Sequence, residues 1–242
     1  MSEKWKVTFT VYRQKADEKS GFQDFELEIN PDEYVLDGIE KIWAYHDRSL
    51  VYRHACHHSA CGACGMRVNH REKLTCITLI RDVTHDGGKI VVEPLRNMPI
   101  ISDLAVDMGQ FFRNLDDVDY NQVQPVNNQP VDKGIQPDKK HAESGMERLV
   151  DCLECGLCIS ACPVAASSDA YLGPAVLAAA SRNMDHIDVH SQVVGENGIW
   201  RCHSAFECTE VCPANVDPAS AIMKLRKRSM FSMFERKGQR NE

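Results

Sequence analysis

We predict an α+β fold, in which a small domain of strands and one helix precedes an all-helical half, and three observations support this prediction. Apolar and polar residues alternate over 4–12 and again over 25–29, which is typical of strands with one buried face. Apolar residues then recur at helical spacing over 35–43. Nearer the C-terminus, Pro174 and Pro218 each stand before an alanine-rich or aliphatic run, as prolines do at helix starts.

The first two strands are predicted to form an antiparallel hairpin, because the connection over 15–21 is polar. Their buried faces carry Trp5, Val7, Phe9 and Val11 on the first strand and Phe25, Leu27 and Ile29 on the second. The helix is expected to close over this sheet through Val35, Ile39, Ile42 and Trp43. A short strand over 90–92 follows, so the first domain is predicted to span residues 1–105.

The second domain, residues 106–242, is predicted to be helical. Ser102 is the expected N-cap of its first helix. The apolar face of that helix repeats at helical spacing: Leu104, Met108, Phe111, Phe112 and Leu115. The stretch over 116–145 is polar and contains three prolines, so we expect a linker or a long surface loop there. Asp217 is the expected N-cap before Pro218.

Composition excludes several classes of protein. The formal net charge is −7, with 28 Lys and Arg against 35 Asp and Glu, which disfavours a nucleic-acid-binding surface. No apolar run approaches the ~20 residues that a membrane-spanning helix needs, and the start lacks the apolar segment of a secretory signal. Eleven cysteines are an odd number, which argues against a disulfide framework and favours thiolate ligands in a reducing compartment.

The first cysteine group has the spacing of a plant-type [2Fe–2S] site. Its members are Cys56, Cys61, Cys64 and Cys76. Small residues between them suit a loop that wraps closely around an inorganic core. Structural zinc is the alternative, although zinc is normally held by two separate Cys-x2-Cys pairs. A Rieske site would need His57 and His58 as ligands, but four cysteines already suffice, so these histidines are expected beside the cluster or at the surface.

The second and third groups form an internal repeat. The run Cys152-x2-Cys155-x2-Cys158-x3-Cys162-Pro163 has the spacing of bacterial ferredoxins, whose fourth cysteine binds the other cluster of a pair. Fifty residues later, Cys202, Cys208, Cys212 and Pro213 match it, with Ala205 in the place of Cys155.

Exchanging the remote cysteines between the two copies assigns one complete [4Fe–4S] site. Its ligands are Cys152, Cys155, Cys158 and Cys212. The remaining site has three thiolates: Cys162, Cys202 and Cys208. A cubane corner without a thiolate either loses its iron, giving [3Fe–4S], or keeps it with water or substrate as ligand, and we favour [3Fe–4S]. This assignment uses every cysteine once.

Three clusters without a nucleotide-binding motif predict an electron relay. No Gly-x-Gly-x-x-Gly motif follows a strand, and no Gly-x4-Gly-Lys motif occurs. No Ser/His/Asp set or His-Glu-x-x-His motif is recognisable either, so we assign no catalytic residue to this chain. Electrons are expected to enter and leave through partner proteins.

With these cysteine motifs, the chain resembles the iron–sulfur subunit of the succinate dehydrogenase and fumarate reductase family along nearly its whole length. The segment Glu93-Pro94-Leu95, the run from Pro99 to Met108 and Trp200-Arg201-Cys202-His203 also carry the resemblance. It implies an N-terminal β-grasp [2Fe–2S] ferredoxin domain and a helical domain with [4Fe–4S] and [3Fe–4S] clusters. It further implies a flavoprotein partner with FAD and a cytochrome b type membrane anchor that binds quinone and in some cases haem b.

One position departs from relatives that use ubiquinone. They carry a Trp four residues after the proline that corresponds to Pro163, whereas this chain has Ser167. Pro163, His203 and Arg226 match or nearly match positions close to quinone in some relatives, although in other relatives they are structural. We therefore expect a menaquinol:fumarate reductase subunit of anaerobic respiration, at the cytoplasmic face of a bacterial inner membrane.

Two alternatives remain within electron transfer. The first is the iron–sulfur subunit of a succinate:quinone reductase of the tricarboxylic acid cycle, and the second is a component of a thiol-linked fumarate or heterodisulfide reductase. Chains of the second kind carry Cys-Cys-Gly modules, and no two cysteines are adjacent here. A third hypothesis is an interaction module stabilised by zinc. Zinc sites, however, do not explain why two copies of a repeat would exchange cysteine ligands.

Overall fold

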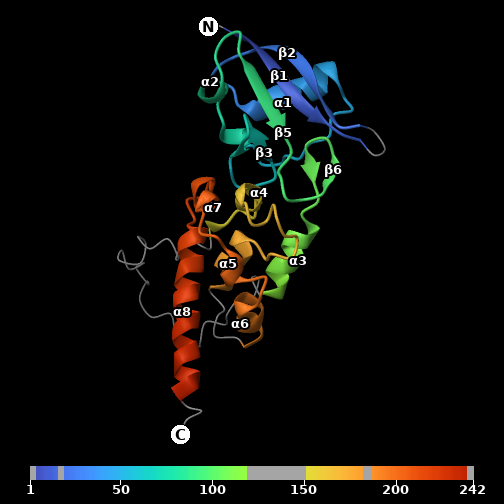
Figure 1. Cartoon of the computed structure of the whole chain (residues 1–242). Helices are drawn as coiled ribbons and strands as arrows, with labels where there is room; N and C mark the ends of the chain where they lie inside the picture. The colour runs from blue at the N-terminus through green and yellow to red at the C-terminus, as the bar shows by residue number, and fades with distance from the viewer. Residues whose placement is uncertain (1–3, 16–18, 119–150, 182–186, 239–242) are drawn as a thin grey trace, which may run out of the picture. The chain divides into compact units, whose positions relative to one another are not determined.

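The computed structural model describes residues 4–15, 19–118, 151–181 and 187–238, which are drawn in colour in Figure 1. These residues form two compact units. The first unit combines residues up to Met108 with 153–161, and the second combines 109–152 with 162–242. No helix in the described part of the chain combines the length and the apolarity that crossing a bilayer requires.

The first unit is built on a five-stranded mixed sheet. Its strands are β1 (Trp5–Arg13), β2 (Gly21–Ile29), β3 (Gly65–Val68), β4 (Arg71–Leu74) and β5 (Lys89–Glu93), in the order β2-β1-β5-β3-β4. β1 pairs antiparallel with β2, with Phe9 opposite Phe25, and parallel with β5, with Phe9 opposite Ile90. The predicted hairpin and third strand are confirmed, and the mixed order is the one expected of a β-grasp domain.

Helix α1 (Val35–Lys41) packs on this sheet through the predicted apolar face. Val35, Ile39 and Ile42 are fully buried in the core of the sheet. The helix comes so close to β1 that a Cβ on Gly38 would lie 2.3 Å from the ring of Phe9. The expectation for Trp43 is wrong, because its side chain is 37% exposed under the guanidinium of Arg48. The chain widens into a π-helical turn, η1 (Ile42–His46), which breaks the α-helical spacing there.

The helix predicted to start at Ser102 begins later. Strands β6 (Ile100–Ser102) and β7 (Ala105–Val106) pair with each other, and helix α3 spans Gly109–Asp117. The apolar pattern still marks buried positions, since all its residues except Phe112 are buried. Phe112 is 42% exposed.

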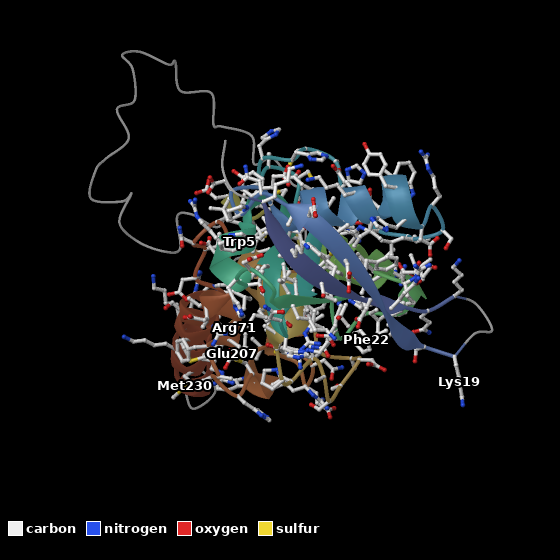
Figure 2. All side chains as sticks on the ribbon, turned by 90° about the horizontal axis from the view of Figure 1, so that it is seen from above. Trp5, Lys19, Phe22, Arg71, Glu207 and Met230 are labelled. Carbon is white, nitrogen blue, oxygen red and sulfur yellow. The ribbon has the colours of Figure 1, made fainter. Side chains whose placement is uncertain are left out.

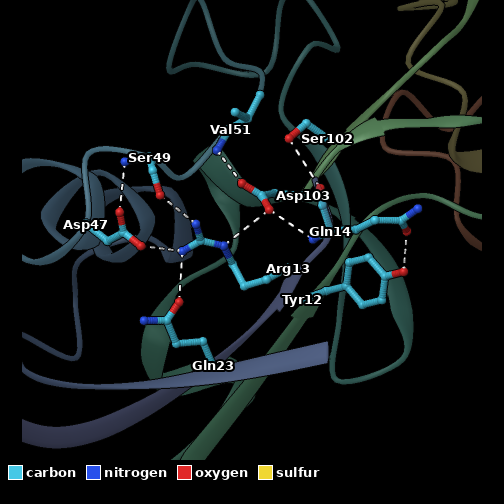
Figure 3. A network of polar contacts seen from close by, with 9 residues as sticks. All are labelled: Tyr12, Arg13, Gln14, Gln23, Asp47, Ser49, Val51, Ser102 and Asp103. Carbon is cyan, nitrogen blue, oxygen red and sulfur yellow. Dashed lines mark hydrogen bonds and ion pairs between the residues drawn. The ribbon is translucent and has the colours of Figure 1, made fainter. Parts of the chain in front are cut away.

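Asp103 explains why this segment turns instead of continuing as a helix. Its side chain is fully buried, and its backbone is left-handed with a φ of 46°. Figure 3 shows its carboxylate accepting hydrogen bonds from the backbone N–H groups of Gln14 and Val51, at 3.0 and 2.9 Å. Arg13 pairs with the same carboxylate at 3.2 Å. These tertiary bonds satisfy a buried charge, so they override the local helical pattern.

Short helical turns complete the first unit: η2 (Thr75–Ile77), α2 (Ile80–Val83) and α4 (Leu157–Ala161). α4 lies in the segment 153–161, which belongs to the first unit although it is distant from it in the sequence. Ser160 within it donates a hydrogen bond to Glu72 at 2.8 Å and accepts one from the backbone N–H of Arg96 at 2.9 Å. This segment is therefore tied to the sheet by buried polar bonds as well as by packing.

The second unit is helical, as predicted. After α3 it contains α5 (Pro174–Ala180), α6 (Ile187–Val194), η4 (Ile199–Arg201), α7 (Glu207–Glu210) and α8 (Pro218–Gly238). Both helix starts predicted at a proline are confirmed, and Asp217 accepts a hydrogen bond from the backbone N–H of Ser220 at 3.0 Å, as an N-cap does. Met230 on α8 is half exposed (Figure 2). Most of the polar stretch over 116–145 lies outside the described residues.

Candidate iron–sulfur sites

The first cysteine loop turns its backbone N–H groups towards sulfur. His57, Ser59 and Gly62 adopt left-handed conformations, with φ of 60°, 62° and 68°. As a result, the backbone N–H groups of His58, Ala60 and Cys61 lie 3.2–3.5 Å from Cys56 Sγ. The hydrogen bonds from His58 and Ala60 lower the pKa of the Cys56 thiol to about 6. The loop thus stabilises a thiolate, the form in which cysteine binds metal.

Pairwise interactions link all four thiols of this group. Cys61 adds a side-chain hydrogen bond to Cys56. Burial, followed by a hydrogen bond with Cys64, raises the pKa of Cys76 to about 12, and the charge of Cys56 adds to this effect. Without a metal, neighbouring thiols disfavour each other's ionisation. A multivalent iron centre supplies the positive charge that allows them to bind together as thiolates. The described residues therefore fit the predicted [2Fe–2S] ligand set.

The two histidines of this loop lie at its surface. Both His57 and His58 are exposed. His57 Nε2 lies 3.2 Å from a carboxylate oxygen of Glu40 on α1, and His54 Nδ1 lies 3.4 Å from the same oxygen. Glu40 therefore connects the residue that follows Cys56 to the helix on the sheet.

The second cysteine segment packs directly on the first loop, within the first unit. A Cβ placed on Gly62 would lie 2.6 Å from the carbonyl oxygen of Leu153 and 2.8 Å from Cys155 Cβ. Gly65 approaches the carbonyl oxygen of Cys155 almost as closely, at 3.2 Å. Only glycine fits at position 62, and a side chain at position 65 would be tight. The close approach brings a thiol of the second group next to the first loop.

The internal repeat is visible in the backbone. Glu154 and Gly156, which flank Cys155, are left-handed, with φ of 51° and 78°. Ser204 and Phe206, which flank Ala205, are left-handed in the same way, with φ of 57° and 63°. Each copy then enters a short helix, α4 or α7. The repeat seen in the cysteine spacing is therefore also a repeat of conformation. Cys155 and Cys158 belong to the first unit and Cys152 and Cys212 to the second, and this four-cysteine ligand set stays a prediction.

The third group forms a pocket within the second unit. Its lining includes all three predicted thiols, Cys162, Cys202 and Cys208, with Ala205 where a fourth ligand would stand. Burial, followed by the charges of Cys162 and Cys202, raises the pKa of Cys208 to about 12. Burial also raises the pKa of Cys162, and the charge of Cys202 adds to it. Three thiols and the methyl group of Ala205 fit a cluster in which one corner has no ligand from the protein.

Tyr171 also lines this pocket, and the sequence pattern did not single it out. It stands before Gly173 and Pro174, where the chain turns into α5. Its side chain is 95% buried, at 5% exposure. No local signal marks such a residue, because its role depends on the cysteines that the fold brings to it.

The three residues expected near quinone have different surroundings. Pro163 and His203 are exposed and line the third pocket. The guanidinium of Arg226, on α8, donates instead to backbone carbonyls of the Cys202 loop: Ile199 at 2.8 Å, Trp200 at 3.5 Å, and Cys202. These hydrogen bonds connect the loop that carries Cys202 to α8.

Two parts of the chain match known families of domain. Residues 8–113 match the family described as a 2Fe-2S iron-sulfur cluster binding domain, and residues 148–216 match the family described as a 4Fe-4S dicluster domain. Together with the cysteine geometry, these matches define an iron–sulfur protein with a [2Fe–2S] domain followed by a domain for two further clusters.

The relatives narrow this class. The fumarate reductase iron-sulfur subunit of Haemophilus influenzae is 33% identical, over 94% of this chain and 95% of its own length. The succinate dehydrogenase iron-sulfur subunit of Coxiella burnetii is 32% identical, over 91% and 95%. A chain of the Mycobacterium smegmatis Sdh1 complex in the apo form shares the fold, with a TM-score of 0.76 at 24% identity over 93% and 95%. The chain therefore belongs to the family of fumarate reductase and succinate dehydrogenase iron–sulfur subunits.

Proposed function

We propose that this chain relays single electrons through [2Fe–2S], [4Fe–4S] and [3Fe–4S] clusters, between a flavoprotein subunit and a quinone-binding membrane anchor. The observation that carries the proposal is the third pocket, where Cys162, Cys202 and Cys208 converge and Ala205 replaces a fourth ligand. Bound clusters supply one-electron redox chemistry, and the chain supplies thiolates, hydrogen bonds and burial that set their potentials.

The order of the sites supports a relay. Gly62 and Cys155 bring the first loop and the second cysteine segment into contact within one compact unit, which favours transfer between the first two clusters. At the third pocket, Pro163 and His203 are exposed, so an acceptor can approach this side. We infer that the flavoprotein, with FAD, exchanges electrons with the first cluster, and that quinone in an anchor of cytochrome b type, with or without haem b, exchanges them with the third.

Fumarate reduction with menaquinol is the direction we favour. Ser167 takes the place of the tryptophan that ubiquinone-linked relatives carry, and its hydroxyl is occupied by a hydrogen bond to the carbonyl of Val164 at 2.9 Å. Succinate oxidation by the same complex is the second candidate, because relatives of both names match the chain over more than nine-tenths of its length. For either direction, we propose that the complex lies at the cytoplasmic side of a bacterial inner membrane.

Metal analysis with electron paramagnetic resonance (EPR) tests the cluster assignment. The full chain, purified anaerobically, is expected to hold about nine irons, and among its three oxidised clusters only [3Fe–4S] should be paramagnetic. About ten irons with a silent oxidised state would mean a complete third cubane. Zinc in place of iron would overturn the relay.

Purification of the native complex tests the partners and the direction. An affinity tag on this chain is expected to recover a flavin-containing subunit and a membrane subunit. Rates of fumarate reduction with a menaquinol analogue and of succinate oxidation with a ubiquinone analogue then compare the two directions. A faster rate in the second assay would reverse the proposed direction and leave the relay intact.

A further inference from the structure

Tyr171 places a buried hydroxyl in the pocket of the third cysteine group. The side chain is 5% exposed, and the pocket it lines contains Cys162, Cys202 and Cys208. Within the described residues, its hydroxyl meets no partner in full hydrogen-bond geometry, although the side chain of Cys202 lies close enough to interact with it.

A buried hydroxyl without a partner is costly. Leaving such a group unsatisfied destabilises a protein, whereas phenylalanine would fill the same space without that penalty. The surrounding residues supply no oxygen or nitrogen acceptor in hydrogen-bonding geometry. What the pocket does supply is sulfur, from three thiols and, in the loaded protein, from the inorganic sulfides.

The electrostatics of Tyr171 agree with this environment. Burial raises the pKa of Tyr171 far above its usual range, and the charges of Cys202 and Cys162 raise it further. A protonated phenol beside electron-rich sulfur is a hydrogen-bond donor.

We propose that the hydroxyl of Tyr171 donates a hydrogen bond to a sulfur of the third cluster and thereby raises its reduction potential. This inference rests on the proposed [3Fe–4S] site. Reduction adds negative charge to the cluster, so a donor to its sulfur stabilises the reduced form more than the oxidised form. Tyr171 would thus help to make the third cluster a good electron acceptor.

The test compares Tyr171→Phe with the wild-type chain in the anaerobically purified complex. The reduction potential of each cluster is measured by redox titration with EPR. The potential of the third cluster alone is expected to fall, by about 59 mV for each tenfold loss in the equilibrium constant of its one-electron reduction. Tyr45→Phe, at an 83% exposed tyrosine of the first unit, is the matched control and is expected to change no potential.

The outcomes separate this inference from the relay itself. An unchanged third potential in Tyr171→Phe, with its EPR signal intact, would overturn the hydrogen bond and leave the relay standing. Loss of the third cluster from Tyr171→Phe would also overturn it, because the hydroxyl would then hold the cluster rather than tune it. A wild-type chain without the [3Fe–4S] signal would refute the proposed site, and this inference with it.

As a second measurement, electron–nuclear double resonance of the oxidised third cluster should show an exchangeable proton in the wild type that is missing in Tyr171→Phe. Identical proton couplings in the two proteins would contradict the proposal.

Discussion

Gly62 offers a direct test of the contact between the first cysteine loop and the second. The change is Gly62→Ala. An alanine there must adopt a φ of 68° and place its Cβ 2.6 Å from the carbonyl oxygen of Leu153. The left-handed conformation costs about 1–2 kcal/mol, and forcing an extra methyl group into packed surroundings costs about 1–3 kcal/mol. The sum is a destabilisation of about 2–5 kcal/mol.

Two glycines of the same unit separate these contributions. Gly87 has a φ of 74° but open space around its missing Cβ, so Gly87→Ala is expected to lose only about 1–2 kcal/mol. Gly21 has open space and no left-handed strain, so Gly21→Ala should leave stability within about 0.5 kcal/mol. The series therefore isolates the close approach at Gly62.

The assay follows the visible circular dichroism of the cluster-loaded chain after dilution into denaturant. If the contact is lost before the transition state of unfolding, the whole difference appears in the unfolding rate. Gly62→Ala should then lose its signal about 5- to 150-fold faster than Gly87→Ala, which corresponds to about 1–3 kcal/mol. Equal rates for these two variants would show that the two loops do not meet at Gly62.

Three further predictions concern the cluster loops. Ala205→Cys should complete the third ligand set, so that the EPR signal of the oxidised cluster disappears and the iron content rises by about one. The reduction potential of the third cluster should then fall. A retained [3Fe–4S] signal would contradict the ligand assignment. Arg226→Ala removes the hydrogen bonds to the Cys202 loop, so EPR should show loss of the third cluster before the other two, whereas Lys227→Ala, at an exposed position of the same helix, should keep all three. In the reduced, cluster-free chain, Cys56 should be alkylated fastest at neutral pH, because a pKa of about 6 leaves it mostly as thiolate. The alkylation rate of Cys56 should fall as the pH drops through 6, while Cys76, with a pKa of about 12, stays unreactive. Peptide mapping by mass spectrometry measures the order in which the cysteines are alkylated, and any other order would contradict this prediction.

Local patterns predicted much of the fold. Alternation marked β1 and β2, because a strand with one buried face repeats every two residues, and a short run of β-branched residues marked β5. The cysteine spacing marked the first thiol group, because its ligands lie close together in the chain. For the third pocket, the exchange of cysteines between the two repeats predicted the three thiols that line it. The same spacing revealed the repeat, whose left-handed residues match copy for copy.

What the patterns missed depends on tertiary contacts. Ser102 has the sequence context of an N-cap, but the buried carboxylate of Asp103 bonds to two distant backbone N–H groups and turns the chain. Trp43 follows a helical period that ends in a wider turn. Tyr171 matters only because folding brings it to three cysteines that are far apart in the sequence. No window of neighbouring residues contains that information.

The inclusion of 153–161 in the first unit has a consequence for biosynthesis. A ribosome releases the chain from the N-terminus, and the five strands are complete once residue 93 has emerged. Even so, α4 and the bond from Ser160 to Glu72 arrive only after residue 160. Until then, Gly62 and Gly65 lack their close approach to the Leu153–Cys155 segment. The start of the second cysteine segment therefore completes the packing of the first cluster loop. This packing can form only after the second cysteine group has been synthesised.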